Sequence, residues 1–383
     1  MAVRNDVVMA LNYYAPYVSG LTEAARLVAE DLVAQGARVL VVTCQHDDSL
    51  PLREVINGVR VIRTPVVGRI GKGLISPTFV STAIRAGRSA RVVNLHLPMI
   101  ESGAIALGLG KTPMVATYQC DISMPKGLVN TLQTKVMDAS NRIALRKSSA
   151  VAVSSNDYAQ LSRLRAAMPE SKRHAISPPT RRLTSGSPSF RGGDGLHVGF
   201  LGRLVEEKGL EYLVEGFKDF ADPEARLLIA GDYTNVAGGS VVNQVKERMG
   251  EDSRIKLLGF LTEAELEDFY ASLDVFALPS VNSFEAFGIV QVEAMKAGVA
   301  ALASDLPGVR TPVQTTGFGV VVRRRNAADI TAALERLKTD PLDSDEGARV
   351  ANLEYSREKT VSEYAKLFAS VSSWRPAAQG DQS

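Results

Sequence analysis

Residues 284–298 read Phe-Glu-Ala-Phe-Gly-Ile-Val-Gln-Val-Glu-Ala-Met-Lys-Ala-Gly and follow the apolar run 275–279. They place two carboxylates, Glu285 and Glu293, eight residues apart. If the helix begins at the start of this stretch, the two side chains lie about 12 Å apart along its axis and roughly 80° apart around it. The paired carboxyls of a glycosidase lie closer together, at roughly 5–10 Å. The spacing suits two separate contacts with a long ligand at a helix N-terminus, where phosphate is favoured. The alternative is an ordinary amphipathic helix with two solvated glutamates.

Strand and helix patterns alternate on both sides of this stretch. Short apolar runs bounded by turn residues predict strands, and longer stretches with helical periodicity predict the helices between them. Such alternation is typical of parallel sheets with right-handed crossovers, so an α/β fold is expected. The expected strands are 6–12, 39–43, 59–62, 92–97, 114–118, 150–154, 197–201, 226–230, 255–258, 275–278 and 299–303; the expected helices are 21–35, 126–147, 210–220, 241–249, 263–273, the one in 284–298, and 358–371.

A stretch rich in Pro, Ser and Arg, residues 175–194, divides this pattern into two blocks and is the expected linker. The 383 residues allow two or three domains of ordinary size. We therefore expect two doubly wound, Rossmann-like domains facing a cleft, residues 1–178 and 179–357. Ligands of such sheets bind at the carboxyl ends of the strands.

The composition is that of a globular protein: 45% apolar, 6% aromatic and a formal net charge of +2. No run approaches the ~18 apolar residues of a membrane span. The first residues lead into a strand without a signal-peptide pattern. Two cysteines and four histidines give no disulfide framework or zinc spacing. We expect a cytoplasmic protein without metal or cofactor, and nucleic-acid binding has little support.

Charge is distributed unevenly along the chain. Residues 1–178 carry +9 and residues 179–383 carry −7. The basic half is suited to anionic lipid, although two halves that complement each other across a cleft would give the same asymmetry. The predicted helix 126–147 mixes apolar and basic residues, which suits peripheral membrane contact or a core-facing helix with a solvated basic face. Further cations concentrate at Arg69, Lys72, Arg85, Arg88 and Arg91.

Unusual residues follow several predicted strands of the first block. The loop 13–20 ends at Gly20, which would let backbone approach a phosphate at a helix start. His96 stands at the end of the strand over 92–97. Most such loops are simple turns, and a lone histidine is more often structural.

In the second block, Arg203 and Lys208 bracket the turn after strand 197–201. Two cations there can neutralise a diphosphate, and an arginine can bind it in bidentate fashion. The alternative is a pair of surface cations beside Glu206 and Glu207. Gly231 and Asp232 follow the next strand, at a turn suited to base or ribose contacts.

The chain resembles the retaining glycosyltransferases of family 4, which have the GT-B fold, over nearly its whole length. The order and spacing of the Arg/Lys pair and the E-x7-E element make the resemblance specific. The residues that carry it are Ser19-Gly20, His96 with Pro98, Gly202-Arg203-Leu204 with Lys208-Gly209, Gly231-Asp232, and Glu285-Ala-Phe-Gly288 through Glu293-Ala294.

The resemblance implies a role for each matching residue. Arg203 and Lys208 would hold the donor diphosphate as leaving group. Glu285 would lie at the transferred sugar and His96 would face that sugar from the N-terminal domain. Glu293 would bind the ribose hydroxyls. Backbone N–H groups and neighbouring positions would complete the donor site: Gly20, Gly202, Gly231, Asp232, Phe287, Gly288 and Ile289.

One position departs from the family pattern, because Ser19 stands where the family has a first loop glycine. A Cβ there restricts positive φ and adds bulk beside the pyrophosphate, while the hydroxyl could donate to a phosphate or to the acceptor. The resemblance also implies that helix 358–371 crosses back onto the N-terminal domain.

The implied reaction moves a hexosyl unit from a UDP- or GDP-linked sugar to an acceptor hydroxyl with retention of configuration. Front-face attack, in which the leaving phosphate takes the acceptor proton, needs no carboxylate base at the anomeric carbon, and no Asp-x-Asp stands at a strand end. We expect metal-independent catalysis on a glycan or lipid-linked acceptor, in cell-surface glycan, glycolipid or polysaccharide synthesis at the inner face of the membrane. The alternatives are a GT-B nucleotide-sugar epimerase and a non-catalytic two-lobed sugar-binding protein.

Overall fold

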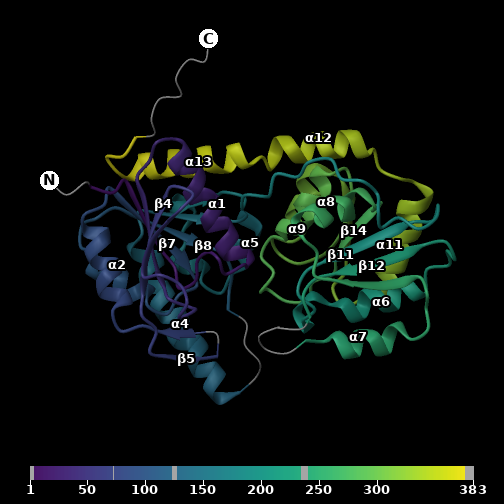
Figure 1. The fold of residues 1–383 in the computed structure, drawn as a ribbon, viewed down its shortest axis with the longest axis horizontal. Helices are drawn as coiled ribbons and strands as arrows, with labels where there is room; N and C mark the ends of the chain where they lie inside the picture. Colours follow the sequence, from purple (N-terminus) through teal and green to yellow (C-terminus); the bar gives the residue numbers. More distant parts are fainter. Residues whose placement is uncertain (1–3, 72, 123–126, 234–239, 376–383) are drawn as a thin grey trace, which may run out of the picture. The chain divides into compact units, whose positions relative to one another are not determined.

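The computed structural model describes residues 4–71, 73–122, 127–233 and 240–375. The chain divides into two compact units. Unit 1 comprises residues 1–179 and 358–383, and unit 2 comprises residues 180–357 (Figure 1). Each unit has a largely or wholly parallel sheet with helices between its strands, which confirms the predicted α/β class and the two Rossmann-like domains.

Unit 1 is built on an eight-stranded sheet within the described residues. Its parallel strands place β1 and β7 side by side at the centre, where the strand order reverses, and only β3 is antiparallel, at one edge. Across the sheet the strands are β10 (Arg173–Ala175), β9 (Ala150–Val153), β8 (Met114–Tyr118), β7 (Val92–Leu97), β1 (Val7–Ala10), β2 (Val39–Cys44), β4 (Val59–Thr64) and β3 (Arg53–Ile56).

Alternation along these strands builds the core of unit 1. Val7 pairs in register with Val39 on one side and Val92 on the other, so the three side chains share one face. That face is covered by α1 (Gly20–Ala34) and by the last helix, α13 (Arg357–Val371), whose Val361, Tyr364 and Phe368 lie in the same core cluster. The other helical elements of unit 1 are α2 (Phe79–Arg88), α3 (Ser102–Gly108), α4 (Leu128–Lys147), α5 (Asn156–Leu161) and the 3-10 turns η1 (Arg165–Ala167) and η2 (Glu170–Lys172); β5 (Gly68–Ile70) and β6 (Gly73–Ile75) form a separate hairpin.

Unit 2 has six parallel strands in the order of a dinucleotide-binding Rossmann fold, with β11 and β14 adjacent where the order reverses. Across the sheet they are β13 (Ile255–Gly259), β12 (Arg226–Ala230), β11 (His197–Leu201), β14 (Val275–Leu278), β15 (Ala300–Ser304) and β16 (Gly319–Val322). The helical elements are η3 (Glu206–Lys208), α6 (Leu210–Lys218), α7 (Val242–Met249), α8 (Glu263–Ala271), α9 (Ile289–Lys296), α10 (Thr311–Thr316), α11 (Ala327–Thr339) and α12 (Ser344–Glu354).

The expected linker is not a free connection. No helix or strand covers residues 176–196, but much of the segment is bound to α8 of unit 2. Thr184 and Ser187 donate backbone N–H groups to Glu267 and Asp268, at 2.9 and 2.8 Å. The change in composition therefore marks a strap along unit 2, and the boundary between the units falls at its beginning, after Pro179.

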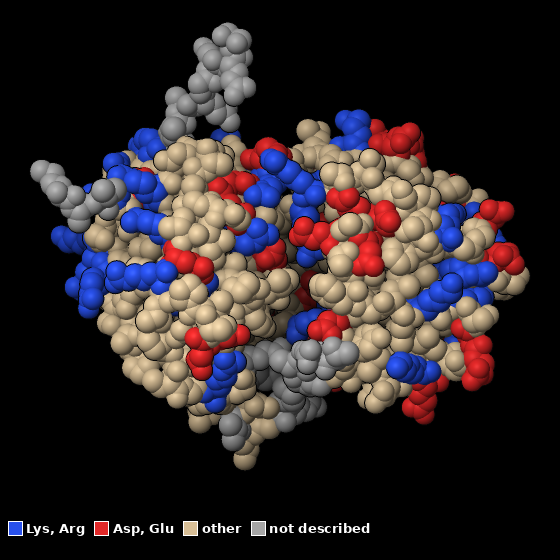
Figure 2. Space-filling model, viewed as in Figure 1, with Lys and Arg blue, Asp and Glu red and all other residues tan. Residues whose placement is uncertain are grey.

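Charged side chains are distributed differently over the two units. Figure 2 shows Lys and Arg side chains gathered on the outer part of unit 1 in this view, whereas basic and acidic side chains are interspersed on unit 2. Within the described part of the chain, no helix has the length and apolar character needed to cross a membrane.

Gly231 is required by the close approach of two strand-end loops in unit 2. It has φ +141°, and a Cβ built on it would lie 1.8 Å from the carbonyl oxygen of Gly202. The neighbouring strand holds this contact in place, because Gly202 N–H donates to Ala230 O at 3.1 Å. Gly231 thus has a packing reason for its identity in addition to any ligand contact.

We predict that Gly231→Ala destabilises unit 2 by about 3 kcal/mol, because a backbone oxygen must move and φ becomes strained. Thermal unfolding should shift down by roughly 10 °C for a domain of this size. Gly192→Ala is the control, since its Cβ would have no neighbour within 4 Å. Equal melting curves for the two variants would contradict this account.

Candidate functional site

The loops that follow β11 and β14 meet where the strand order of unit 2 reverses. Val281 N–H donates to Glu207 O at 2.9 Å and joins the two loops. Gly209 has φ +65°, and a Cβ on it would lie 2.3 Å from the carbonyl oxygen of Pro279. Sheets of this kind bind ligands in the crevice at such a switch point. The loops are therefore held close together at the edge where a ligand is expected.

Lys208 and Glu285 form an ion pair at this edge. Lys208 Nζ lies 2.5 Å from Glu285 Oε2, and the side chains are 16% and 17% exposed. The two residues are 77 positions apart in sequence, so only the fold brings them together. The pair offers a cation and a carboxylate side by side, partly accessible to solvent.

Arg203 stands on the same β11 loop but extends further into solvent. Its Nη2 lies 3.5 Å from Glu207 Oε1, and its side chain is 42% exposed. An exposed pair of this kind contributes little to stability. The guanidinium is consequently available to turn toward an anion beside Lys208.

The helix of the opening stretch begins later than predicted, and the geometry inferred for Glu285 and Glu293 is wrong. Gly288, with φ +81°, precedes α9, so Glu285 lies in the loop before the helix. A Cβ on Gly288 would lie 2.3 Å from Leu278 Cδ2, which explains why a glycine stands at this turn. The expected separation of Glu285 and Glu293, about 12 Å along a helix axis and roughly 80° around it, does not apply, because the segment is not one helix.

The start of α9 presents backbone donors without a side-chain cap. The first N–H groups of a helix have no partner within the helix, so they can bind an anion. Phe287 does not obstruct this end, because its ring is buried against Tyr355, with centroids 5.7 Å apart. Ile289 and Asp232, two further predicted donor contacts, are half-buried.

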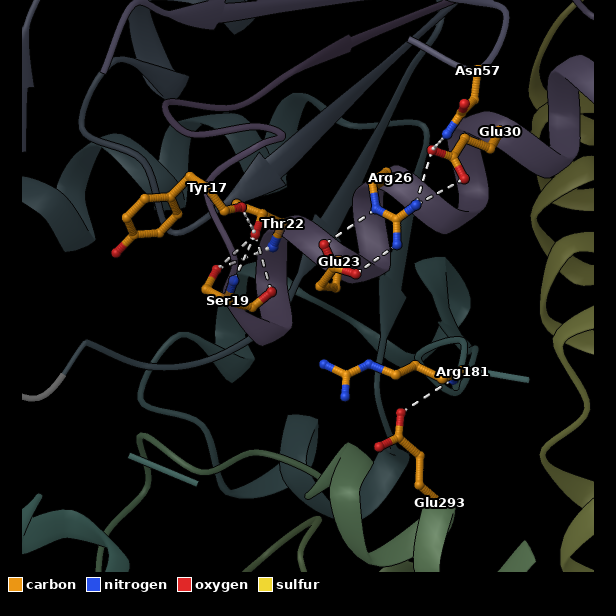
Figure 3. A network of polar contacts seen from close by, with 9 residues as sticks. All are labelled: Tyr17, Ser19, Thr22, Glu23, Arg26, Glu30, Asn57, Arg181 and Glu293. Atoms are coloured by element: carbon orange, nitrogen blue, oxygen red, sulfur yellow. Dashed lines mark hydrogen bonds and ion pairs between the residues drawn. The ribbon is translucent and has the colours of Figure 1, made fainter. Parts of the chain in front are cut away.

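Glu293 is buried on α9 and held by two groups that sequence patterns did not reveal. Its Oε1 accepts from Arg181 N–H at 3.1 Å and its Oε2 from Tyr270 O–H at 3.2 Å (Figure 3 shows the Arg181 contact). Burial raises the pKa of Glu293, while these hydrogen bonds and the charge of Arg181 act in the opposite direction. Arg181 precedes Glu293 by 112 residues, so no local signal could have identified it.

In unit 1, Ser19 is the N-cap of α1. Its Oγ accepts from Thr22 N–H at 3.3 Å, and its own N–H donates to Thr22 Oγ1 at 2.9 Å, which forms a capping box (Figure 3). Ser19 has φ −156°, an extended conformation that needs no glycine. The expected restriction of positive φ is therefore irrelevant here, and the hydroxyl is used by the cap. Gly20 is exposed at the first position of the helix.

Next on α1, Arg26 is fully engaged by carboxylates. Its guanidinium contacts Glu23 at 2.7 Å and Glu30 at 3.0 Å, and Glu30 also accepts from Asn57 (Figure 3). The charge of Arg26 is thus compensated within unit 1.

His96 lies within β7, one residue before the end of the strand, and only 3% of it is exposed. Its Nδ1 is 3.3 Å from Gln119 Nε2, and its buried Nε2 has no hydrogen-bond partner in the described residues. Burial lowers the pKa of His96 to about 4, so the imidazole is neutral at pH 7. It lies beside β1 at the reversal point of this sheet, consistent with a site residue as well as a structural one.

Sequence reasoning missed an aromatic cluster after β1 and β2. The rings of Tyr13, Tyr17 and His46 have centroids 4.5–5.8 Å apart, and all three side chains are partly exposed. Arg63, which is buried, supports the loop from behind by donating to Ala15 O at 2.7 Å. Tyrosines spaced along a loop give no periodic signal, so only the fold reveals the cluster.

Several of the other basic residues singled out in the sequence form hydrogen bonds or ion pairs within unit 1. Arg88 donates to Gly108 O at 2.8 Å, Arg91 lies 3.1 Å from Asp6, and Arg69 donates to His46 O. Lys72 and Lys126 lie outside the described residues. In the described ranges, no group of three or more His, Cys, Asp or Glu side chains could hold a metal ion.

Two family descriptions match consecutive parts of the chain. Residues 19–179 match the "Glycosyl transferase 4-like domain", and residues 189–357 match "Glycosyl transferases group 1". The first match ends at residue 179, where the first segment of unit 1 ends, and the second lies within unit 2 and ends with it at residue 357.

The curated relatives of this chain are also glycosyltransferases or sugar-phosphate synthases by name. Phosphatidyl-myo-inositol mannosyltransferase of Mycobacterium leprae is 27% identical over 86% of this chain and 87% of its own length. Mannosylfructose-phosphate synthase of Agrobacterium fabrum is 29% identical over 53% of this chain. The chain spans 32–42% of the length of the first curated relatives it matches.

Solved structures share the fold at low identity. Sucrose-phosphate synthase from Thermosynechococcus elongatus superposes with a TM-score of 0.79 at 19% identity, covering 96% of this chain and 99% of its own. HepE of Anabaena, solved in complex with UDP, gives 0.72 at 16% identity, covering 95% and 100%. With both domain families matched in order, the chain belongs to family 4 of the glycosyltransferases with the GT-B fold.

Proposed function

We propose that this protein transfers a hexosyl unit from a nucleoside-diphosphate sugar to an acceptor hydroxyl, with retention of anomeric configuration. The observation that carries the proposal is the ion pair of Lys208 and Glu285 at the switch point of unit 2. Around it stand an arginine and an uncapped helix N-terminus. This combination of groups suits a sugar joined to a diphosphate better than it suits either part alone.

Unit 2 supplies the groups that the leaving diphosphate requires. Breaking the anomeric C–O bond places negative charge on the phosphate oxygen. Lys208, Arg203 and the N–H groups at the start of α9 would stabilise that charge as it develops. Lys208 and the start of α9 are positioned before the donor binds, whereas Arg203 would have to turn toward the diphosphate.

Glu285 has two roles in this proposal. It holds the Lys208 ammonium at the loop edge, and its remaining lone pairs can accept hydrogen bonds from sugar hydroxyls. In the proposed front-face mechanism Glu285 does not act as a nucleophile. The acceptor hydroxyl would attack on the face that the diphosphate leaves, and a phosphate oxygen would take its proton.

The donor is proposed to be UDP- or GDP-linked. Structures of the neighbour HepE include complexes with UDP and with UDP-glucose, which supports a nucleotide-sugar donor. Curated relatives are named as a mannosyltransferase and a glucosyltransferase, which supports a hexosyl unit. Glu293 is proposed to bind the ribose hydroxyls through the lone pairs that the hydrogen bonds from Arg181 N–H and Tyr270 O–H leave available.

Unit 1 is proposed to bind the acceptor, a glycan or lipid-linked sugar of cell-surface glycan, glycolipid or polysaccharide synthesis in the cytoplasm. Tyr13, Tyr17 and His46 offer partly exposed ring faces with polar tips, which suit a sugar ring. The proposed role of His96 remains at the transferred sugar, where it would use Nε2, which has no hydrogen-bond partner among the described residues. An epimerase with this fold would consume the donor without an acceptor, so product analysis distinguishes the two reactions.

The first test is a mass-spectrometric screen of UDP-, GDP- and ADP-sugars for binding and turnover with mixed glycan acceptors.

We predict that Lys208→Ala and Glu285→Ala each lower kcat by about a hundredfold or more, because each removes charge stabilisation or its support. Both side chains are partly exposed, so melting temperatures should change little.

Arg349→Ala is the matched control for these variants. It removes an ion pair of 2.7 Å, to Glu346, from an exposed helix in the same unit. Its turnover should equal that of the unaltered protein. Near-normal turnover in both site variants would overturn the site assignment.

We further predict that turnover is unchanged in excess EDTA, because the charge on the leaving phosphate is met by Lys208, Arg203 and backbone N–H groups. Initial rates with and without the chelator, and after addition of Mg²⁺ or Mn²⁺, measure this directly. A strict loss of activity that either ion restores would contradict metal-independent transfer.

A further inference from the structure

Helix α4 of unit 1 carries an exposed apolar stripe along its outer face. The residues are Leu128, Leu132, Val136, Ala139 and Ile143. The exposed fractions of Leu128, Leu132 and Val136 are 93%, 64% and 46%. At 100° per residue, all five positions fall within an arc of about 80°. They thus form one continuous line over roughly 22 Å of the helix.

The stripe faces away from the domain. Asn141, Ala144 and Leu145 are the buried residues of α4, and they centre about 170° around the helix from the stripe. Asn141 Oδ1 accepts from Met99 N–H at 3.1 Å and from Ser102 O–H at 3.0 Å, which fixes that side against α3. The apolar side is therefore not the core-facing side, in contrast to an ordinary amphipathic helix of a globular domain.

The first turns of α4 lie outside the packed body of unit 1. Among the described side chains of the helix, none before Asn141 is buried. Figure 1 shows the N-terminal end of α4 extending beyond the other helices and strands of unit 1. The exposed leucines at this end of the helix carry a free-energy cost in water, and a second surface that covers the stripe would remove it.

The charges on α4 specify what that surface is. Lys135, Arg142, Arg146 and Lys147 lie on the stripe or within about 40° of its edges. None of the four takes part in an ion pair with another described residue. The one carboxylate of the helix, Asp138, lies to the side and is held by Arg163 at 2.7 Å. An apolar line bordered by uncompensated cations is complementary to acyl chains beneath anionic headgroups.

We propose that the outer face of α4 is a docking surface for an anionic lipid bilayer, on which the helix lies parallel to the membrane plane. Leu128, Leu132 and Val136 enter the boundary between headgroups and acyl chains. The four cations extend to the phosphates. This docking is independent of the proposed transfer reaction, so it can be tested with no donor or acceptor.

The test measures co-sedimentation of the full chain with sonicated vesicles of phosphatidylglycerol and phosphatidylcholine, and with phosphatidylcholine alone, across a salt series. The full chain should bind the anionic vesicles, more weakly as salt rises. Leu132→Glu should lower the partition coefficient at least tenfold. Replacing Lys135 and Arg146 by Gln should weaken binding by about fivefold for each charge removed.

Leu353→Glu is the matched control, because Leu353 is 62% exposed on α12 of unit 2 and the substitution adds the same charge. It should bind like the unaltered chain. Circular dichroism and melting curves confirm that both Glu variants are folded, as expected for exposed positions. The proposal is overturned if the unaltered chain does not bind anionic vesicles, or if Leu132→Glu and Leu353→Glu bind equally. It is also overturned if size-exclusion chromatography shows that Leu132→Glu instead dissociates a dimer, since the face would then join two copies of this chain.

Discussion

The hydrogen bond from Val281 N–H to Glu207 O holds together the two loops that carry Lys208 and Glu285. It joins the loops after β11 and β14, the two adjacent strands at which the strand order of the sheet reverses. Two glycines permit the approach: Gly209 faces Pro279 O, and Gly288 lets the chain turn into α9. Lys208 and Glu285 meet because of these backbone constraints, and their ion pair is a consequence of the fold rather than its cause. The two side chains are only 16% and 17% exposed, so the cost of desolvating both charges offsets much of their attraction, and the pair is weak evidence of a stabilising role.

The bounds of several strands were predicted more accurately than the local structure around the predicted site residues. The apolar runs of β11, β12 and β14 give their bounds directly, because buried parallel strands are continuous hydrophobic segments. The sequence pattern did not predict β16 or helices α10 to α12, where apolar residues are fewer and turns are close together. The helix of the opening stretch was placed too early, because a helical period does not register the left-handed turn at Gly288, where a Cβ would clash with Leu278 and Gln291.

Long-range partners explain the remaining differences. Glu293 was identified as a site residue, but its contacts with Arg181 and Tyr270 join segments far apart in the chain. Ser19 seemed a departure that could disturb phosphate binding, yet the extended backbone and the bond from Thr22 N–H make it a helix cap. In both cases the residue type was informative, and the role depended on neighbours that only the fold supplies.

The pairing of Lys208 with Glu285 also sets a condition on donor binding. A diphosphate that approaches Lys208 must share the ammonium with a carboxylate already 2.5 Å away, and the carboxylate repels it. An ammonium has three donors, so it can keep Glu285 while contacting phosphate, provided that further positive groups offset the repulsion. Arg203 and the start of α9 are the groups available for this purpose. In the proposed reaction the same carboxylate would favour the positive character that develops on the sugar, so one ion pair would oppose premature anion binding and assist bond cleavage.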